Sequence, residues 1–325
     1  MNIIGIDIGG TKCAVLLGHI DRDGGMEVLD KSVFATADYP GPDGMLPQFQ
    51  NGITEILTKN KLEIKDIVSM GISCGGPLDS KKGVILSPPN LPGWDDVHIV
   101  EFFEKRFSVP VAIQNDANAC ALAEWKFGAG RGTRNMIFLT FGTGMGAGLI
   151  LDGKLYSGTN DNAGEVGHIR LDNIGPVGYG KAGSFEGFCS GGGIAQLARI
   201  RAMEKLQMGE KVSFCKGISE LQSITAQQVA EAAKDGDPLA TGVFETCGTY
   251  LGRGLSVLID ILNPECIVLG SIYVRSGELL IPSLEKALEA ESLSPARDVC
   301  RIVPAEMDER LGDIASLSVA ANHLS

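Results

Sequence analysis

Two short glycine-rich turns in this sequence could bind phosphate groups, and the first lies close to the N-terminus. Gly9-Gly10-Thr11-Lys12 follows the apolar run from Ile3 to Ile8 and leads directly into a second apolar run, Cys13 to Leu17. A glycine turn between two strands leaves backbone N–H groups uncovered, and phosphate binds to concavities of this kind. Asp7, at the strand end, could hold Mg²⁺ through water. Taken alone, the motif fits an ordinary hairpin turn equally well. It is not a Gly-Lys-Ser/Thr P-loop, which requires a helix after the turn.

A second glycine turn, Gly142-Thr143-Gly144, repeats this arrangement far along the chain. An apolar run, Met136–Phe141, enters it and another, Met145–Leu151, leaves it. Two similar hairpins predict two related α/β domains, each presenting a phosphate loop to one nucleotide, ATP with its Mg²⁺. This duplication resembles the two-domain actin-like ATPase (ribonuclease H-like) fold of sugar kinases, with an interdomain cleft. We expect Gly270, which ends the apolar run Ile267–Leu269, to lie beside the adenosine.

Asp116 is the candidate for a catalytic base. It follows a predicted buried strand, 110–114, and opens a predicted helix over 117–126, with Asn115 beside it. Transfer of a phosphoryl group to a hydroxyl needs a carboxylate that accepts the hydroxyl proton, and Asn115 could fix a neighbouring hydroxyl. The alternative is that Asp116 only caps the helix N-terminus, a common role for aspartate.

Two further carboxylates and an imidazole lie on glycine-rich loops. Glu165 and His168 belong to the stretch 164–168, and Glu186 follows in another glycine-rich stretch. Such a set suits a polyhydroxyl ligand, because a carboxylate can accept hydrogen bonds from two neighbouring hydroxyl groups. For His168 the alternative is an ordinary loop histidine whose hydrogen bonds are satisfied within the protein.

Over nearly its whole length the chain resembles the ROK family, named for repressors, open reading frames and kinases. The resemblance rests on motifs that occur in the same order. These are Asp7-Ile-Gly-Gly-Thr-Lys12, Gly76-Pro77-Leu78-Asp79, Asn90 in Asn-Leu-Pro-Gly-Trp, Asn115-Asp116-Ala-Asn118-Ala119, Gly142-Thr143-Gly144-Met-Gly146, Ala163-Gly164-Glu165-Val-Gly167-His168 and Glu186. The resemblance implies an ATP-dependent sugar kinase that phosphorylates a hexose hydroxyl, usually O6.

The same resemblance implies roles for individual residues. Asp116 is the general base, and the two glycine hairpins hold ATP with Mg²⁺. The groups implied to bind the sugar are Gly76, Asn90, Asn115, Glu165, His168 and Glu186. Glucose is the first expected substrate, because the Asn-Leu-Pro-Gly-Trp loop and both glutamates resemble those of glucokinases. Fructose, mannose, allose and N-acetylhexosamines stay open, as do another phosphoryl donor, a non-sugar alcohol and a catalytically idle sugar-binding homologue.

One family motif is changed. Members commonly carry Cys-x-Cys-Gly-x-x-Gly-Cys-x-Glu, whose three thiolates bind zinc together with the histidine. Here the three cysteine positions hold Val177, Tyr179 and Ser184. Cys189 lies close in sequence, but one thiolate and the imidazole of His168 do not make a tetrahedral structural site. We therefore predict no zinc and expect aromatic packing to order this loop.

The composition limits the classes of partner. The 325 residues carry 28 basic and 40 acidic side chains, a formal net charge of −12, which argues against nucleic acid or an anionic membrane as the main partner. No apolar run is long enough to span a membrane, and Met1 leads directly into the first predicted strand. We therefore expect neither a leader peptide nor the DNA-binding module of the family's repressors. The eight scattered cysteines indicate a reducing, cytoplasmic location, and a homodimer is expected from the family and from the frequency of two-fold oligomers.

The elements that must position these groups follow from hydrophobic patterning and from Gly and Pro. Strands are predicted near 2–8, 12–18, 26–35, 67–72, 110–114, 136–141, 145–151 and 267–271, and helices near 45–59, 98–107, 117–126, 191–208, 238–262 and 313–323. We expect a smaller N-terminal α/β domain, 1–115 plus 310–325, and a larger C-terminal α/β domain, 116–309, joined by a hinge.

Overall fold

The structure is a computed structural model that describes residues 1–307 and 310–324. The chain divides into two compact units. Unit 1 comprises Met1–Arg134, Gly148–Ala163 and Glu306–Ser325, and unit 2 comprises Asn135–Ala147 and Gly164–Ala305. This division differs from the domains predicted from the sequence, 1–115 with 310–325 and 116–309, because residues 116–134 and 148–163 group with the N-terminal residues.

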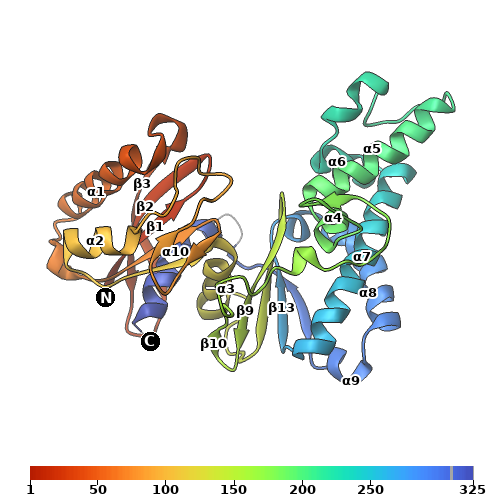
Figure 1. The fold of residues 1–325 in the computed structure, drawn as a ribbon. Coiled ribbons are helices and arrows are strands. Elements are labelled where there is room, and N and C mark those ends of the chain that lie inside the picture. Colours follow the sequence, from red (N-terminus) through yellow and green to blue (C-terminus); the bar gives the residue numbers. More distant parts are fainter. Residues whose placement is uncertain (308–309, 325) are drawn as a thin grey trace. The chain divides into compact units, whose positions relative to one another are not determined.

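Unit 1 is built on a five-stranded mixed sheet. Its strands are β1 (Asn2–Ile8), β2 (Lys12–Ile20), β3 (Met26–Ala35), β4 (Ile67–Cys74) and β7 (Val111–Asn115). The order across the sheet is β3-β2-β1-β4-β7, in which β1, β2 and β3 pair antiparallel while β4 pairs parallel with both β1 and β7 (Figure 1). The carboxyl ends of β1, β4 and β7 therefore lie at the same edge of the sheet, which is where parallel sheets commonly carry their ligands.

Both faces of this sheet are covered by helices. Alternate residues of β1 divide between two apolar clusters: Ile4 and Ile6 pack with α1 (Gly41–Lys59) and α2 (Ile99–Phe107), whereas Ile3 packs with α10 (Leu311–His323). Since side chains alternate across a strand, burial on both faces makes β1 a continuous apolar run. The helix α3 (Asp116–Phe127) packs against α10.

Three strand glycines allow α10 to approach the sheet closely. A Cβ atom at Gly71 would lie 2.2 Å from the backbone nitrogen of Ala320, and one at Gly5 would lie 2.4 Å from the hydroxyl of Ser316. A Cβ atom at Gly18 would lie 2.8 Å from the side chain of Leu317. These glycines weaken their strands but let the helix backbone take the space of a side chain.

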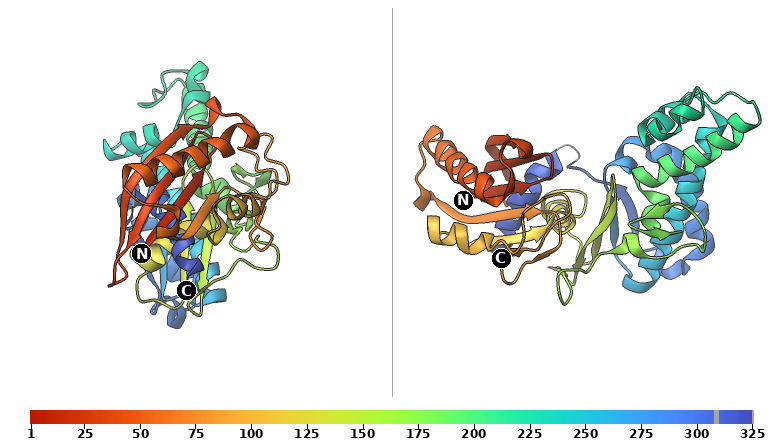
Figure 2. Two further views of the ribbon diagram at one scale, coloured as in Figure 1. Left: turned by 90° about the vertical axis from the view of Figure 1, so that its left-hand side faces the viewer. Right: turned by 45° about the horizontal axis from the view of Figure 1, so that its top comes forward.

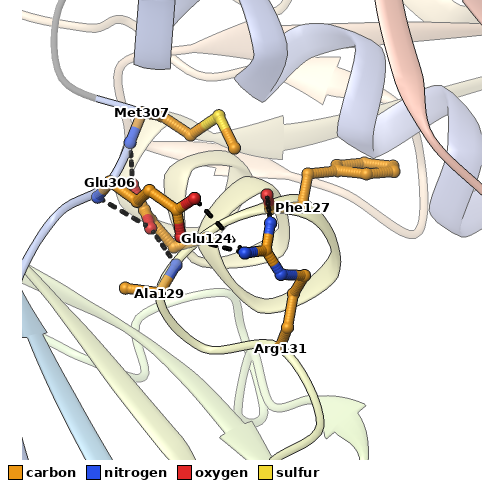
Figure 3. A network of polar contacts seen from close by, with 6 residues as sticks. All are labelled: Glu124, Phe127, Ala129, Arg131, Glu306 and Met307. Atoms are coloured by element: carbon orange, nitrogen blue, oxygen red, sulfur yellow. Dashed lines mark hydrogen bonds and ion pairs between the residues drawn. The ribbon is translucent and has the colours of Figure 1, made fainter.

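A fully buried carboxylate fixes the chain where it re-enters unit 1 (Figure 3). Glu124 of α3 accepts hydrogen bonds from the backbone N–H groups of Ala129 at 2.8 Å, Glu306 at 3.2 Å and Met307 at 2.9 Å. Nearby, Arg131 donates to the carbonyl of Phe127 at 2.6 Å and pairs with the side chain of Glu306 at 3.2 Å. Hydrogen bonds to an ionised group are about twice as strong as neutral ones, so Glu124 holds the start of the segment that leads to α10.

A second five-stranded sheet has the order β10-β9-β8-β13-β14. Its strands are β8 (Met136–Phe141), β9 (Met145–Leu151), β10 (Lys154–Leu155), β13 (Cys266–Leu269) and β14 (Arg301–Pro304). β13 pairs parallel with β8 and β14. Strand β9 carries the chain from unit 2 into unit 1 after Ala147.

The helices of unit 2 gather around one long helix. They are α4 (Phe185–Cys189), α5 (Gly191–Gln207), α6 (Ala226–Lys234), α7 (Pro238–Leu262), α8 (Ile272–Glu291) and α9 (Ser294–Arg297). α7 packs against the other five, and two further views show it running beside α8 (Figure 2). Short hairpins complete the chain: β5 (Leu78–Asp79) with β6 (Val84–Ile85), and β11 (Val177–Gly178) with β12 (Lys181–Ala182).

The strands and helices expected from the sequence are confirmed, with ends that shift by a few residues. The helices α4, α6, α8 and α9, the strand β14 and the short strands β5, β6, β10, β11 and β12 were not expected. Within the described part of the chain, no helix is long and apolar enough to cross a membrane.

Candidate functional site

The first glycine turn joins β1 to β2 as predicted, and neighbouring backbone packs tightly against it. The N–H of Gly9 donates to the carbonyl of Lys12 at 3.2 Å, and the hydroxyl of Thr36 donates to the carbonyl of Gly9 at 2.7 Å. A Cβ atom at Gly9 would lie 2.8 Å from the carbonyl oxygen of Lys12, and one at Gly10 equally far from that of Asn90. Both glycines are therefore required by close approach, and the second places Asn90 beside the turn.

The strand register of unit 1 explains how Asp7 and Asp116 come together. Asp7 of β1 pairs with Ser73 of β4, and Ser73 pairs with Gln114 of β7, so the three residues form one row across the sheet. Asp116 follows Gln114 by two residues at the same edge. The two carboxylates are near enough that each disfavours the ionisation of the other.

The pKa values of both acids are raised. Burial raises the pKa of Asp7 to about 6, with smaller contributions from the negative charges of Asp313 on α10 and of Asp116, while Lys31 and Lys12 lower it. The pKa of Asp116 is also raised, because desolvation outweighs the hydrogen bond of 2.8 Å that its carboxylate accepts from the N–H of Ala117. Although Asp116 reaches solvent, its carboxylate holds a proton more tightly than an ordinary aspartate does.

The start of α3 separates the roles of Asn115 and Asp116. The N-cap is Asn115, whose side-chain oxygen accepts the N–H of Asn118 at 2.7 Å. Asp116 is the first helical residue, so the alternative in which Asp116 is itself the N-cap is wrong. Its carboxylate lies at the positive end of the helix dipole. The cap leaves the amide nitrogen of Asn115 as the group that could donate to a ligand hydroxyl.

Gly76 and Asn90 lie on loops of unit 1. Gly76 follows the carboxyl end of β4, and a Cβ atom there would meet nothing within 4 Å. Asn90 is exposed and faces the glycine turn through its backbone, as described above. The space beside Gly76 is therefore not filled by other parts of the protein, and the side chain of Asn90 is open to a ligand.

The second glycine turn, between β8 and β9 in unit 2, is held by its surroundings. The N–H of Gly142 donates to the carbonyl of Gly144 at 3.2 Å, and the carbonyl of Gly142 accepts the N–H of Gly191 at 2.8 Å. On the other side, the carboxylate of Glu186 accepts the N–H of Met145 at 3.0 Å. Thr143, at the tip, is exposed.

A cavity of about 790 Å³ in unit 2 borders this second turn. The residues that line it include Gly142, Thr143, Gly191, Gly192, Ser271 and Ile272, together with Ile224, Ala230 and Phe244. A cavity of this size, lined by apolar residues together with polar and charged side chains such as Arg199, Lys234 and Arg275, suits a nucleoside. Gly270 itself donates to the carbonyl of Leu139 at 3.1 Å and does not line the cavity, whereas the next residue does.

The loop between Gly164 and Cys189 is ordered by side-chain contacts. The rings of His168 and Tyr179 meet edge to face at 5.2 Å, and Lys181 donates to the carbonyl of His168 at 2.6 Å. The amide of Gln196 donates to the carbonyl of Val177 at 2.9 Å and accepts its N–H at 3.0 Å.

The zinc site implied by the family resemblance does not fit these residues. Val177 and Tyr179 are exposed, and the hydroxyl of Ser184 caps α4 by accepting the N–H of Gly187 at 3.0 Å. Among the described residues, no group of three or more His, Cys, Asp or Glu side chains is arranged to hold a metal ion. No step of the chemistry is therefore assigned to zinc.

Each unit gathers part of the predicted site. In unit 1 these are Asp7, Gly9 to Lys12, Gly76, Asn90, Asn115 and Asp116, and in unit 2 they are Gly142 to Gly144, Glu165, His168, Glu186 and Gly270. Glu165 is exposed, and its side chain makes no hydrogen bond or ion pair to the residues that the structure describes. The sequence did not predict a role in the site for Thr36, for Asp313 or for the residues that line the cavity. Thr36 directly follows β3 and Asp313 lies in the first turn of α10, but both patterns are common and carry no signal of their own.

Comparisons with known proteins show the family and the fold of the chain. Residues 3–321 match the ROK family. A glucokinase of Halalkalibacterium halodurans is 30% identical over 298 residues, which are 91% of this chain and 87% of that protein. A ROK family glucokinase from Streptomyces griseus, solved in complex with glucose and AMPPNP, is 28% identical and has a TM-score of 0.74, with 99% of each chain covered.

A regulator is similar as well. The structure of a ROK family transcriptional regulator, a homologue of the Escherichia coli MLC protein, has a TM-score of 0.82 and 26% identity, and the match covers 99% of this chain and 79% of the regulator. The expected family and the expected two-domain α/β fold are thus confirmed, and the chain belongs to the ROK family.

Proposed function

We propose that this protein transfers the γ-phosphoryl group of ATP to the 6-hydroxyl of a hexose, with glucose as the first candidate and Asp116 as the general base. The observation that carries the proposal is the pair of glycine hairpins. One lies in unit 1 at the sheet edge that holds Asp7 and Asp116, and the other borders a cavity of nucleoside size in unit 2. Together with the glucokinase relatives, this makes the chain an ATP-dependent sugar kinase.

The nucleotide is assigned to the cavity and the hairpins. The apolar part of the cavity, with Ile224, Ala230 and Phe244, would take the adenosine, and the backbone N–H groups around Gly142 would face the phosphates. The Gly9–Lys12 turn offers a second set of N–H groups. Mg²⁺ bound to ATP would neutralise the charge that develops on the phosphates, and Asp7 is the carboxylate placed to hold it through water.

Asp116 would accept the proton of the sugar hydroxyl. Its raised pKa makes the carboxylate a stronger base than ordinary aspartate, which favours proton abstraction as the phosphoryl group is transferred. The helix cap formed by Asn115 fixes the backbone on which Asp116 sits. Little covalent chemistry is left to the protein beyond this, so positioning and charge stabilisation account for most of the rate.

Each unit, taken by itself, holds some of the groups proposed to bind the sugar. Asn115, through its amide nitrogen, and Asn90 belong to unit 1, and Glu165, His168 and Glu186 belong to unit 2. Glucose ranks first because the similar proteins include several glucokinases. We propose further that the loop carrying His168 and Glu186 needs no zinc, since its positions for thiolates hold Val177, Tyr179 and Ser184.

The test is a coupled assay of ADP release with ATP·Mg²⁺ against hexoses, N-acetylhexosamines and free polyols, with polyphosphate as an alternative donor. We expect one strongly preferred hexose. The variant Asp116→Asn should lower kcat by a factor of about 10³ while glucose and AMPPNP bind nearly as in the wild type. A near-normal kcat in this variant would show that Asp116 is not the base. Sugar binding by calorimetry without turnover of any substrate would instead identify a sugar-binding homologue, since fold alone does not imply catalysis.

A further inference from the structure

Glu186 contacts the nucleotide hairpin directly. It lies in the first turn of α4, and its Oε2 atom accepts the N–H of Met145 at 3.0 Å. Met145 is the first residue of β9, directly after the turn Gly142-Thr143-Gly144. Met145 is buried, so this hydrogen bond is shielded from water and bears a full negative charge on the acceptor.

Glycines surround the Glu186 side chain and leave it little freedom. A Cβ atom at Gly144 would lie 3.0 Å from Oε2 of Glu186, and Cβ atoms at Gly167 and Gly178 would lie 3.2 and 2.9 Å from the Cβ of Glu186. None of these three glycines has a positive φ. Gly144 is therefore explained by space for the Glu186 side chain. At Gly167 and Gly178 the nearest atoms are backbone atoms, the carbonyl oxygen of Met145 at 2.4 Å and the nitrogen of Gly187 at 2.6 Å, and the Glu186 side chain comes second.

The same short segment also holds the other end of the hairpin. Gly191, five residues after Glu186, donates its N–H to the carbonyl of Gly142 at 2.8 Å. Between them, Ser190 caps α5 by accepting the N–H of Gly193 at 3.0 Å. The stretch from Glu186 to Gly191 therefore forms hydrogen bonds at both ends of the turn.

We infer that Glu186 is a positioning residue for the nucleotide hairpin as well as a sugar ligand, with one carboxylate oxygen for each task. Oε2 holds the N–H of Met145, whereas Oε1 makes no hydrogen bond to the described residues and is left for a sugar hydroxyl. A sugar bound to Oε1 then restrains the same side chain that restrains the hairpin. Sugar occupancy and nucleotide affinity are thereby coupled inside unit 2. The sugar half of this inference rests on the proposed function, and the hairpin half does not.

A simple charge effect makes the opposite prediction. A carboxylate close to the phosphates of a nucleotide repels them, so its removal would raise nucleotide affinity whichever neutral residue replaced it. If Glu186 instead holds the hairpin in place, the effect depends on whether the new residue can still accept the N–H of Met145. Glutamine keeps an acceptor oxygen of the same reach, and alanine does not.

The experiment is calorimetric titration of AMPPNP·Mg²⁺ into the full-length protein without sugar. We expect Glu186→Ala to weaken binding about tenfold, the fold-change that follows from losing one hydrogen bond to a charged group. Glu186→Gln should stay within about threefold of the wild type. Glu165→Ala is the matched control, because it removes another proposed sugar ligand that does not touch the hairpin, and its nucleotide affinity should be unchanged. Equal or tighter binding by Glu186→Ala would overturn the inference.

A second measurement covers the case in which Glu186→Ala does not fold. Glu186→Asp keeps the charge but shortens the side chain by one methylene, so it should weaken AMPPNP binding as alanine does. With ¹⁵N-methionine, one amide among eight must be followed, that of Met145, because the nitrogen of Met1 is the N-terminal amino group. Glucose should shift this amide in the wild type but not in Glu186→Asp, and an unshifted wild-type amide under saturating glucose would contradict the coupling. Absence of any sugar binding would refute the proposed function and with it the sugar half of the inference, whereas the hairpin half would still be decided by the nucleotide titration.

Discussion

The raised pKa of Asp7 means that this side chain destabilises the folded protein at neutral pH. The unfolded chain releases the proton near the ordinary value of 3.8, whereas the folded chain holds it up to about 6. The folded state therefore binds more protons than the unfolded state between these values, and stability is lost as the pH rises through that window. An amide side chain cannot ionise, so Asp7→Asn should be more stable than the wild type at pH 8.

The magnitude follows from the size of the shift. A displacement from 3.8 to about 6 corresponds to about 3 kcal/mol at pH 8, since one pKa unit is worth about 1.4 kcal/mol. At pH 5 the Asp7 side chain of the folded protein is still mostly protonated. Its destabilisation of the folded state is then about half of the value at pH 8. The advantage of Asp7→Asn should therefore grow by about 1.4 kcal/mol between pH 5 and pH 8. This increment is independent of any constant difference in packing between an amide and a protonated carboxyl.

Urea unfolding followed by tryptophan fluorescence would measure this increment, because both tryptophans, Trp94 and Trp125, lie in unit 1 with Asp7. Trp94 is buried in the core, and the indole N–H of Trp125 donates to the carbonyl of Thr133 at 2.8 Å, so both should report loss of native packing. The control is Asp23→Asn, in an exposed turn of the same unit. A stability difference between Asp7→Asn and wild type that is the same at pH 5 and pH 8 would refute the reasoning. The variant should also lose activity, as expected where a functional carboxylate is kept at the expense of stability.

Three further predictions concern the cavity, the metal and the buried carboxylate. Ala230→Trp should fill the cavity beside the second hairpin and raise the KM for ATP more than about tenfold, with the KM for glucose nearly unchanged. If the variant and the wild type have the same KM for ATP, the nucleotide binds elsewhere. Metal analysis of protein purified without chelator should find no stoichiometric zinc, and EDTA with excess Mg²⁺ should not change Tm, whereas one zinc per chain would contradict the proposed zinc-free loop. Glu124→Gln should destabilise unit 1 by about 2–4 kcal/mol, because an amide nitrogen would then face a buried N–H. An unchanged urea midpoint would show that the carboxylate of Glu124 does not stabilise unit 1.

Much of unit 1 could be predicted because its strands carry unmistakable patterns. β1 is buried on both faces and has isoleucine at four of its seven positions, and the glycine turn that follows marks its end. By contrast, α8 was missed because Gly277 and Pro282 interrupt its sequence and Ser276 has a non-helical conformation inside it. β14 was missed because none of its four residues is fully buried.

The candidate site could be predicted by residue type but not by partner. Asp7, Asp116 and Glu186 were identified from their neighbours in sequence, yet the row from Asp7 through Ser73 to Gln114 depends on strand register, which no local pattern specifies. The contact between Glu186 and Met145 could likewise not be predicted, because it joins residues 41 positions apart, one in the first turn of α4 and the other at the start of β9. Only the tertiary structure determines which residues come into contact in such pairs.

The position of α10 shows how a residue outside the site contributes to its chemistry. Glu124 fixes the N–H groups of Glu306 and Met307, and Met307 packs with Ile314 of α10 in a small apolar cluster. The sheet glycines then admit the helix at a distance that side chains would forbid. Asp313, at the start of this helix, is thereby placed near Asp7, where its charge helps to raise the pKa of Asp7. Since the Lys31 ion pair with Asp313 opposes this effect only in part, a shift of α10 would change the charge beside the first hairpin. The sequence assigned this helix to the N-terminal domain but gave no sign that its packing makes it part of the electrostatics of the site.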